Sequence, residues 1–88
     1  MNKVTEEHIK LRIVDELYSV DGTLTVCILT MANGFKVIGT SACVDPANFN
    51  AELGRELAYK DAFNKLWPLE GYLLAEKLYQ DGSDEEEN

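Results

Sequence analysis

The spacing of apolar residues divides the chain into helical and strand-like segments. Near the N-terminus Ile9, Ile13 and Leu17 recur every four residues, which is the spacing of one helix face. Thr5 is a good N-cap for such a helix, and Asp21-Gly22 is typical of a turn that ends one. The pattern therefore predicts an N-terminal helix that continues up to this turn.

Two runs rich in β-branched residues follow, over 23–31 and 35–44, with Asn33-Gly34 between them. An Asn-Gly pair between such runs is a strong hairpin signal, because both residues accept the positive φ of a type I′ turn. If these two residues form the loop, Ile28 lies opposite Gly39. The segment is therefore predicted to be a two-stranded antiparallel hairpin in this register.

Both faces of the predicted hairpin carry many apolar side chains. One face holds Leu24, Val26, Ile28, Thr30, Phe35, Val37 and Cys43, and the other holds Thr25, Cys27, Leu29, Met31, Lys36, Ile38, Thr40 and Ala42. Cys27 and Cys43 then point to opposite faces and should not form a disulfide. A hairpin open to water on one side would alternate apolar and polar residues. Either helices cover both faces, or a second copy of the chain covers one face or extends the sheet edge; we expect a homodimer through the hairpin.

The C-terminal part of the body reads as helical. Asp45-Pro46 starts a short turn, and Asn50 is an N-cap candidate for a helix over 51–66. Pro68 should end or kink that helix near Trp67, and a further helix fits 69–80. The predicted fold is α+β: an N-terminal helix, a two-stranded antiparallel hairpin and a Pro-kinked C-terminal helical segment, in the order α-β-β-α. Residues 1–80 form one domain. The order is similar to that of a double-stranded-RNA-binding domain with one strand missing.

The charge is unevenly distributed. The 88 residues include 16 acidic and 8 basic side chains, a net charge of −8, but five of the acids lie in the last eight residues, DGSDEEEN. Residues 81–88 are therefore predicted to be a disordered acidic tail, either solubilising or a decoy for a basic surface. Residues 1–80 keep a net charge of −3 and lack the lysine-rich helix start of RNA-binding domains, so nucleic-acid binding is not expected. No apolar run reaches the ~18–20 residues of a membrane-spanning helix.

The potential catalytic and metal-binding residues form no recognised pattern. Two cysteines and one histidine are too few for the usual zinc sites. Cys43 precedes a helical turn, which can activate a thiol, but His8 is the sole histidine and nothing places it near Cys43. We therefore expect neither an enzyme nor a metal or cofactor, and name no catalytic residue.

A recognition surface is expected around the Pro68 kink, where several aromatic residues recur at helical spacing. Three glycines at positions 39, 54 and 71 suggest close approach of another element, a partner or a ligand, since glycine is costly inside helices and strands. The candidate binding residues are Asn48, Arg55, Tyr59, Trp67, Glu70 and Tyr72.

The chain also resembles a known family over Leu24–Leu78. The matching stretches are LTVCILT (24–30), NGFKVIGTSACVDPANF (33–49), AELGRELAY (51–59) and WPLEGYLLAEKL (67–78). They resemble the small phage and prophage proteins named for gene product forty-nine of coliphage N-four and gene product sixty-six of Shigella phage Sf-six. The resemblance implies a phage or prophage gene expressed in a bacterial cytoplasm, and it implies no activity. The N-terminal helix and the acidic tail lie outside it.

Two functions from different classes fit these observations. The first is a small non-enzymatic phage accessory protein that binds a bacterial host protein, in host takeover or counter-defence. The alternative is a dimeric protein that binds a small, nucleotide-like signal molecule in a polar pocket at the dimer interface, near Thr40, Ser41, Asn48 and Arg55.

Overall fold

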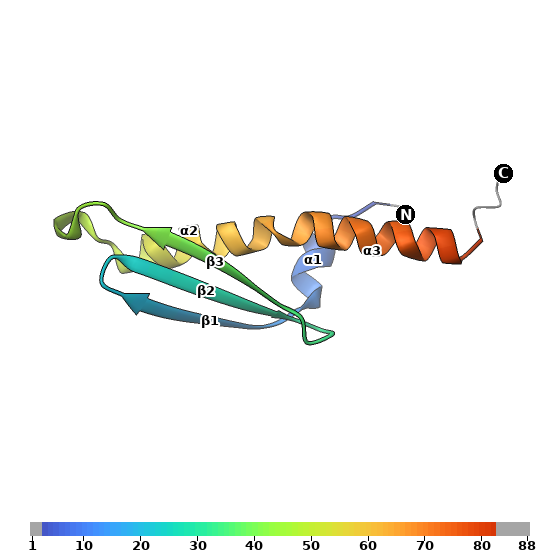
Figure 1. Cartoon of the computed structure of the whole chain (residues 1–88), viewed down its shortest axis with the longest axis horizontal. Helices are drawn as coiled ribbons and strands as arrows, with labels where there is room; N and C mark the ends of the chain where they lie inside the picture. The colour runs from blue at the N-terminus through green and yellow to red at the C-terminus, as the bar shows by residue number, and fades with distance from the viewer. Residues whose placement is uncertain (1–2, 83–88) are drawn as a thin grey trace.

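The computed structural model describes residues 3–82, so the predicted acidic tail lies almost entirely outside the described residues. The elements are α1 (Glu6–Arg12), β1 (Ile13–Asp21), β2 (Leu24–Met31), β3 (Lys36–Ala42), the 3₁₀ turn η1 (Pro46–Asn48), α2 (Ala51–Asn64) and α3 (Leu66–Gln80). The three strands form one antiparallel sheet in the order β1-β2-β3. The α+β class is confirmed, but the two-stranded hairpin is wrong, because the sheet has a third strand and the order is α-β-β-β-α (Figure 1).

The third strand comes from the segment predicted as the second half of the N-terminal helix. Thr5 caps α1 as expected, since its Oγ1 accepts a hydrogen bond from the His8 amide at 3.1 Å, but the helix ends at Arg12. From there Ile13–Asp21 pairs with β2. The Asp21-Gly22 pair is not a helix stop: Asp21 ends β1 opposite Leu24, and Gly22, at φ 61°, forms the hairpin turn with Thr23. Pairing with β2 stabilises the extended form of a segment whose apolar residues also fit helical spacing.

The β2–β3 hairpin exists, but its predicted register is wrong by one residue. Only Gly34 of the Asn-Gly pair has positive φ, at 91°, and the Gly34 amide donates to the Met31 carbonyl at 2.8 Å. The loop therefore has three residues, Ala32 to Gly34, of the kind that combines a type I turn with a left-handed residue. Ile28 consequently lies opposite Ile38, and Gly39 opposite Cys27.

The corrected register turns β3 over relative to β2. The Cys43 amide donates to the Thr23 carbonyl, so Cys43 extends the same pairing and lies on the Cys27 side of the sheet, not on the opposite one. Both thiols are free. Since Cys27 faces Gly39, four residues before Cys43, about 13 Å of strand separates the two positions, well beyond the span of a disulfide.

The core lies between α2 and one face of the sheet. Its buried apolar residues are Ile9, Cys27, Leu29, Met31, Val37, Ala58, Ala62, Phe63 and Leu66. α2 sits directly on β3, because a Cβ at Gly39 would collide with the backbone of Ala58 and Ala62. Gly54 is similar: a Cβ there would lie 2.6 Å from the Thr25 hydroxyl. The close approach expected at these two glycines is confirmed, whereas Gly71 meets no atom within 4 Å.

The C-terminal helical segment is bent, as predicted, but the break is at Lys65 and not at Trp67. Pro68 lies in the first turn of α3, where its missing N–H leaves no helical hydrogen bond unmade. Asn50 and Asp45 act as the expected caps, accepting from the Leu53 and Ala47 amides. α3 continues past the end of the sheet, which gives the molecule a longest extent of 59 Å (Figure 1).

The other face of the sheet carries no helix of residues 3–82. The side chains of Leu17, Ile28 and Ile38 form one row across the three strands on that face. Leu17 and Ile38 are 56% and 50% exposed, and Ile28 is half-buried even on the central strand. The hairpin is therefore apolar on both sides, as predicted, but only one side is covered.

Candidate functional site

Helix α3 presents large apolar side chains to solvent on one side. Leu69, Tyr72, Leu73 and Tyr79 lie on one helix face and are 44%, 72%, 47% and 71% exposed. We call these four residues the α3 strip. In the described chain only Leu66 and Glu70 of α3 are buried. Much of this helix is therefore exposed to solvent, although its sequence is apolar enough to bury a face.

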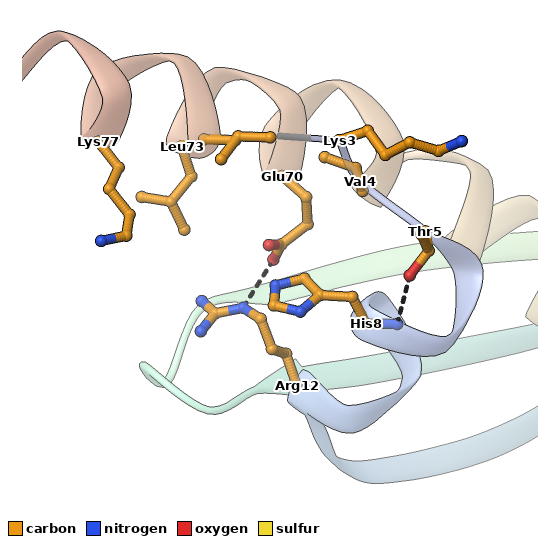
Figure 2. A pocket seen from close by; sticks show the side chains of 9 residues that line it. Lys3, Val4, Thr5, His8, Arg12, Glu70, Leu73 and Lys77 are labelled. Atoms are coloured by element: carbon orange, nitrogen blue, oxygen red, sulfur yellow. Dashed lines mark hydrogen bonds and ion pairs between the residues drawn. The ribbon is translucent and has the colours of Figure 1, made fainter. Parts of the chain in front are cut away.

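A cavity of about 500 Å³ lies beside the strip, where the N-terminal segment and α1 face α3 (Figure 2). Val4, Leu73 and Leu74 make its apolar wall, and Thr5, His8, Arg12, Glu70 and Lys77 supply polar groups, with Lys3 at the rim. His8 and Arg12 are four residues apart, so one face of the short α1 helix brings both to the cavity. The volume falls within the range of small-molecule sites.

An ion pair crosses the cavity and ties α3 to the start of the sheet. The Arg12 Nε donates to the Glu70 carboxylate at 3.0 Å, and the Glu70 side chain is almost completely buried. Figure 2 shows the two Nη groups of Arg12 turned away from Glu70, on the side where the Lys77 ammonium also lies. Lys77 in turn has an exposed contact with Asp81 at 3.5 Å. Among the residues that line the cavity, Lys3, Arg12 and Lys77 outnumber the single carboxylate of Glu70, so the lining is net basic within an acidic chain.

A second hollow, of about 430 Å³, lies on the opposite side of α1. Three aromatic rings form a ladder along it: Tyr59 and Phe63 have centroids 5.8 Å apart, and Phe63 and Trp67 lie edge to face at 6.1 Å. Lys10, which pairs with Glu6 at 3.1 Å, faces the ladder from α1. Burial raises the pKa of the Tyr59 hydroxyl. The ladder therefore joins α2 and the start of α3 on the side of α1 away from the basic cavity.

The structure distributes the six predicted binding residues over several places. Glu70 lines the basic cavity, Tyr59 and Trp67 line the aromatic hollow, and Tyr72 belongs to the α3 strip. Arg55 lies beside Tyr59 in a shallow hollow next to β1, and Asn48 lies near Cys43 in another. Of the four residues expected near a polar pocket at the dimer interface, Ser41 and Asn48 line one hollow and Arg55 lines another.

Sequence reasoning missed the residues that make the basic cavity. The sequence patterns single out neither Arg12 nor Lys77, and they bring in His8 only as a partner that nothing places near Cys43. The distance in sequence between Arg12 and Glu70, 58 positions, is the reason. The four-residue spacing of His8 and Arg12 was the one local signal available.

The two cysteines occupy different environments. Burial raises the pKa of the Cys27 thiol, with Tyr18 beside it across the strand pair. The Cys43 thiol is half-buried and donates to the Asp45 carbonyl at 3.1 Å. His8 lies by the basic cavity, and Cys43 lies in the hollow next to η1. Among residues 3–82, no three His, Cys, Asp or Glu side chains form a group that could hold a metal ion.

Comparison with known families decides the provenance of the chain. The profile of the phage protein (N4 Gp49/phage Sf6 gene 66) family matches residues 4–78. The chain belongs to this phage family. The match begins at residue 4, so the expectation that the N-terminal helix lies outside the resemblance is wrong, and α1 and β1 are part of the family's common unit. No curated protein and no solved structure is significantly similar to the chain. In the described part, no helix is both long enough and apolar enough to cross a bilayer.

Proposed function

We propose that this phage protein is a non-enzymatic accessory protein that binds a bacterial host protein, in the host cytoplasm, through the α3 strip. One observation carries the proposal: α3 extends past the sheet with Leu69, Tyr72, Leu73 and Tyr79 exposed on one face. An exposed apolar helix face is the pattern that enters a hydrophobic groove of a partner. Tyrosine is also a favoured anchor at protein interfaces.

The basic cavity defines the chemistry of that partner. It adjoins the strip through Leu73, and its Arg12 Nη groups and Lys77 ammonium attract negative charge. The partner surface is therefore an apolar groove with an aspartate or glutamate at its rim. Such a carboxylate would form a charge-assisted hydrogen bond with Arg12 while its apolar neighbours cover Leu73.

The test is site-specific photo-crosslinking during infection or prophage induction. A crosslinking amino acid replaces Tyr72 in one variant and the exposed Lys60 of α2 in a control. The expected result is one discrete host protein crosslinked at position 72 and not at position 60. Purified, that protein should bind the wild-type chain and lose binding at least about tenfold to Leu73→Asp, a change of about 1.4 kcal/mol. Crosslinks at position 72 that yield only the chain itself, or nothing discrete, would overturn the proposal.

A second candidate function rests on the same cavity. Its volume and its three cationic side chains, Lys3, Arg12 and Lys77, also suit a small anionic molecule, such as a nucleotide. Thermal unfolding with a panel of nucleotides would separate the two functions, since a ligand at 100 times its Kd adds about 2.7 kcal/mol of stability. The Arg12→Met variant should abolish any such gain, and Arg55→Met, outside the cavity, should retain it. A panel without any shift would contradict this candidate.

A further inference from the structure

The uncovered side of the sheet is a second apolar surface, separate from the α3 strip. We call it the open sheet face. It consists of four rows across β1, β2 and β3, namely Asp15–Thr30–Lys36, Leu17–Ile28–Ile38, Ser19–Val26–Thr40 and Asp21–Leu24–Ala42. Its centre is apolar. Its one basic residue, Lys36, lies at one end on β3, diagonal to Asp21 at the other end on β1.

The edges of the sheet are closed to further strands, whereas its face is not. On β3 the Thr40 amide donates to the Asp61 carboxylate at 2.9 Å, and the Lys65 ammonium donates to the Ile38 carbonyl at 2.6 Å. These side chains occupy backbone groups that another strand would need. On β1 a bulge at Val14 and the acids Asp15 and Glu16 disfavour edge pairing. A further chain can therefore join the sheet only by packing against its open face.

We infer that a second copy of the chain covers the open sheet face, related by a two-fold axis parallel to β2. This axis places β1 of one copy over β3 of the other and keeps each row over the same row. Leu17 then packs on Ile38 of the second copy, and Ile28 packs on its own equivalent. Asp15 comes next to Lys36 of the second copy, and the symmetry makes this ion pair twice.

Charge selects this axis over the perpendicular one. A two-fold axis across the strands would place β1 over β1 and reverse the order of the rows. Asp15 would then lie over Asp21 of the second copy, twice, and these like charges would repel. Within one chain the Lys36 ammonium already donates to the Thr30 hydroxyl at 2.7 Å, so it is held on the open sheet face, ready for a partner carboxylate.

The size of the open sheet face determines how much surface the dimer can bury. Three strands about 4.8 Å apart and ~25 Å long give a contact that buries on the order of 1,000 Å² in total. This value is at the low end for specific interfaces, so the dimer should be reversible and dissociate on dilution. The face-to-face packing of the two sheets leaves α3 of both copies accessible.

Sedimentation velocity over a concentration series tests the dimer with the full chain. Wild type should shift from monomer to dimer with rising concentration. Asp15→Lys and Lys36→Glu each replace two attractive pairs by two repulsive ones, so each variant alone should weaken the dimer at least about tenfold. An equimolar mixture of the two variants should regain the wild-type affinity as a mixed dimer. In it, one ion pair forms with the charges exchanged between positions 15 and 36, and the other is the native pair of Asp15 with Lys36.

The outcomes separate the possibilities. Lys60→Glu makes the same charge change on exposed α2 and should leave the dissociation constant unchanged. The circular dichroism spectrum of each variant must match that of wild type. Ile38→Asp, a substitution at an exposed apolar position, should disrupt the dimer independently of the ion pairs. A stronger dimer in Asp15→Lys would favour the perpendicular axis and overturn this one. A wild-type monomer at all concentrations, or variants that dimerise like wild type, would overturn the inference outright, without bearing on the α3 strip.

Discussion

The two helices of the bent C-terminal segment, α2 and α3, differ sharply in how closely they pack against the rest of the fold. α2 lies against β2 and β3 so closely that Gly39 leaves no room for a Cβ, and Ala58 and Ala62 are completely buried. α3 follows after the break at Lys65 and runs past the end of the sheet, and only its Leu66 and Glu70 are buried. The stability of the fold therefore resides in the contact between α2 and the sheet, and α3 contributes a surface.

This difference has a consequence for motion. Elements with few buried apolar contacts open at low free energy, independently of the core. The Arg12–Glu70 ion pair, the buried Leu66 side chain and the edge-to-face contact of Trp67 with Phe63 attach α3 to the rest of the described chain. A helix held in this way can adjust to a partner without unfolding the sheet.

The largest expected loss of stability comes from disturbing the contact between α2 and the sheet. Gly39→Ala would place a Cβ against the backbone of Ala58 and Ala62, which cannot move aside as a flexible side chain would. The free energy of unfolding should fall by about 3 kcal/mol or more, and folding can fail altogether. Urea unfolding followed by circular dichroism measures it. A loss below about 1 kcal/mol would mean that α2 packs less closely on Gly39 than these contacts imply.

The next effect concerns the attachment of α3. Glu70→Ala leaves Arg12 without its carboxylate partner in a partly buried site and should cost about 1–2 kcal/mol. Hydrogen exchange should accelerate in α3 while the amides of β2 and α2 stay protected. Lys10→Ala breaks an exposed pair and serves as the control, with an effect below about 0.5 kcal/mol. Uniform acceleration across the molecule would contradict the independence of α3.

Local signals predicted the N-caps of the fold well. Thr5, Asp45 and Asn50 all cap the elements expected of them, because an N-cap depends on neighbours within three residues. The same locality explains the errors. Ile9, Ile13 and Leu17 fit a helix face, and only pairing with β2 favours the strand. The register slipped because one glycine, not the Asn-Gly pair, adopts positive φ.

The candidate site was less predictable than the fold. Glu70, Trp67 and Tyr72 were identified from the kink and its aromatic neighbours, yet they belong to three different surfaces. The partner of Glu70 is Arg12, from the other end of the chain. The spacing of residues within either helix cannot predict that contact, since it depends on where α3 passes over the first strand.

Alkaline pH should weaken the packing between α2 and the sheet. Burial raises the pKa of the Cys27 thiol above its ordinary value of 9.0, and burial also raises that of the Tyr18 hydroxyl above 10.0, with a hydrogen bond to Glu16 adding to the effect. The folded state thus keeps protons that the unfolded state releases. The stabilisation is complete below about pH 9 and is lost as the pH rises towards the folded-state values.

Urea unfolding at several pH values between about 8 and about 11 checks this sign. Cys27→Ala removes the thiol and should delay the onset of the loss until Tyr18 begins to matter, near its ordinary pKa of 10.0. A free energy of unfolding that stays constant, or rises, over this interval would contradict the burial of these groups.

The smallest effect comes from the loosely held half and has the opposite sign. Gly71 lies inside α3, and a Cβ there would meet no atom within 4 Å. Gly71→Ala should therefore stabilise the helix by up to about 1 kcal/mol, because alanine loses less conformational freedom on folding. The same substitution at Gly39 is strongly destabilising, so the pair measures the contrast between the two halves directly. If Gly71→Ala also destabilises the chain, or weakens its binding to a host protein, then position 71 is in contact with another molecule, and the uncovered surface of α3 extends beyond the α3 strip.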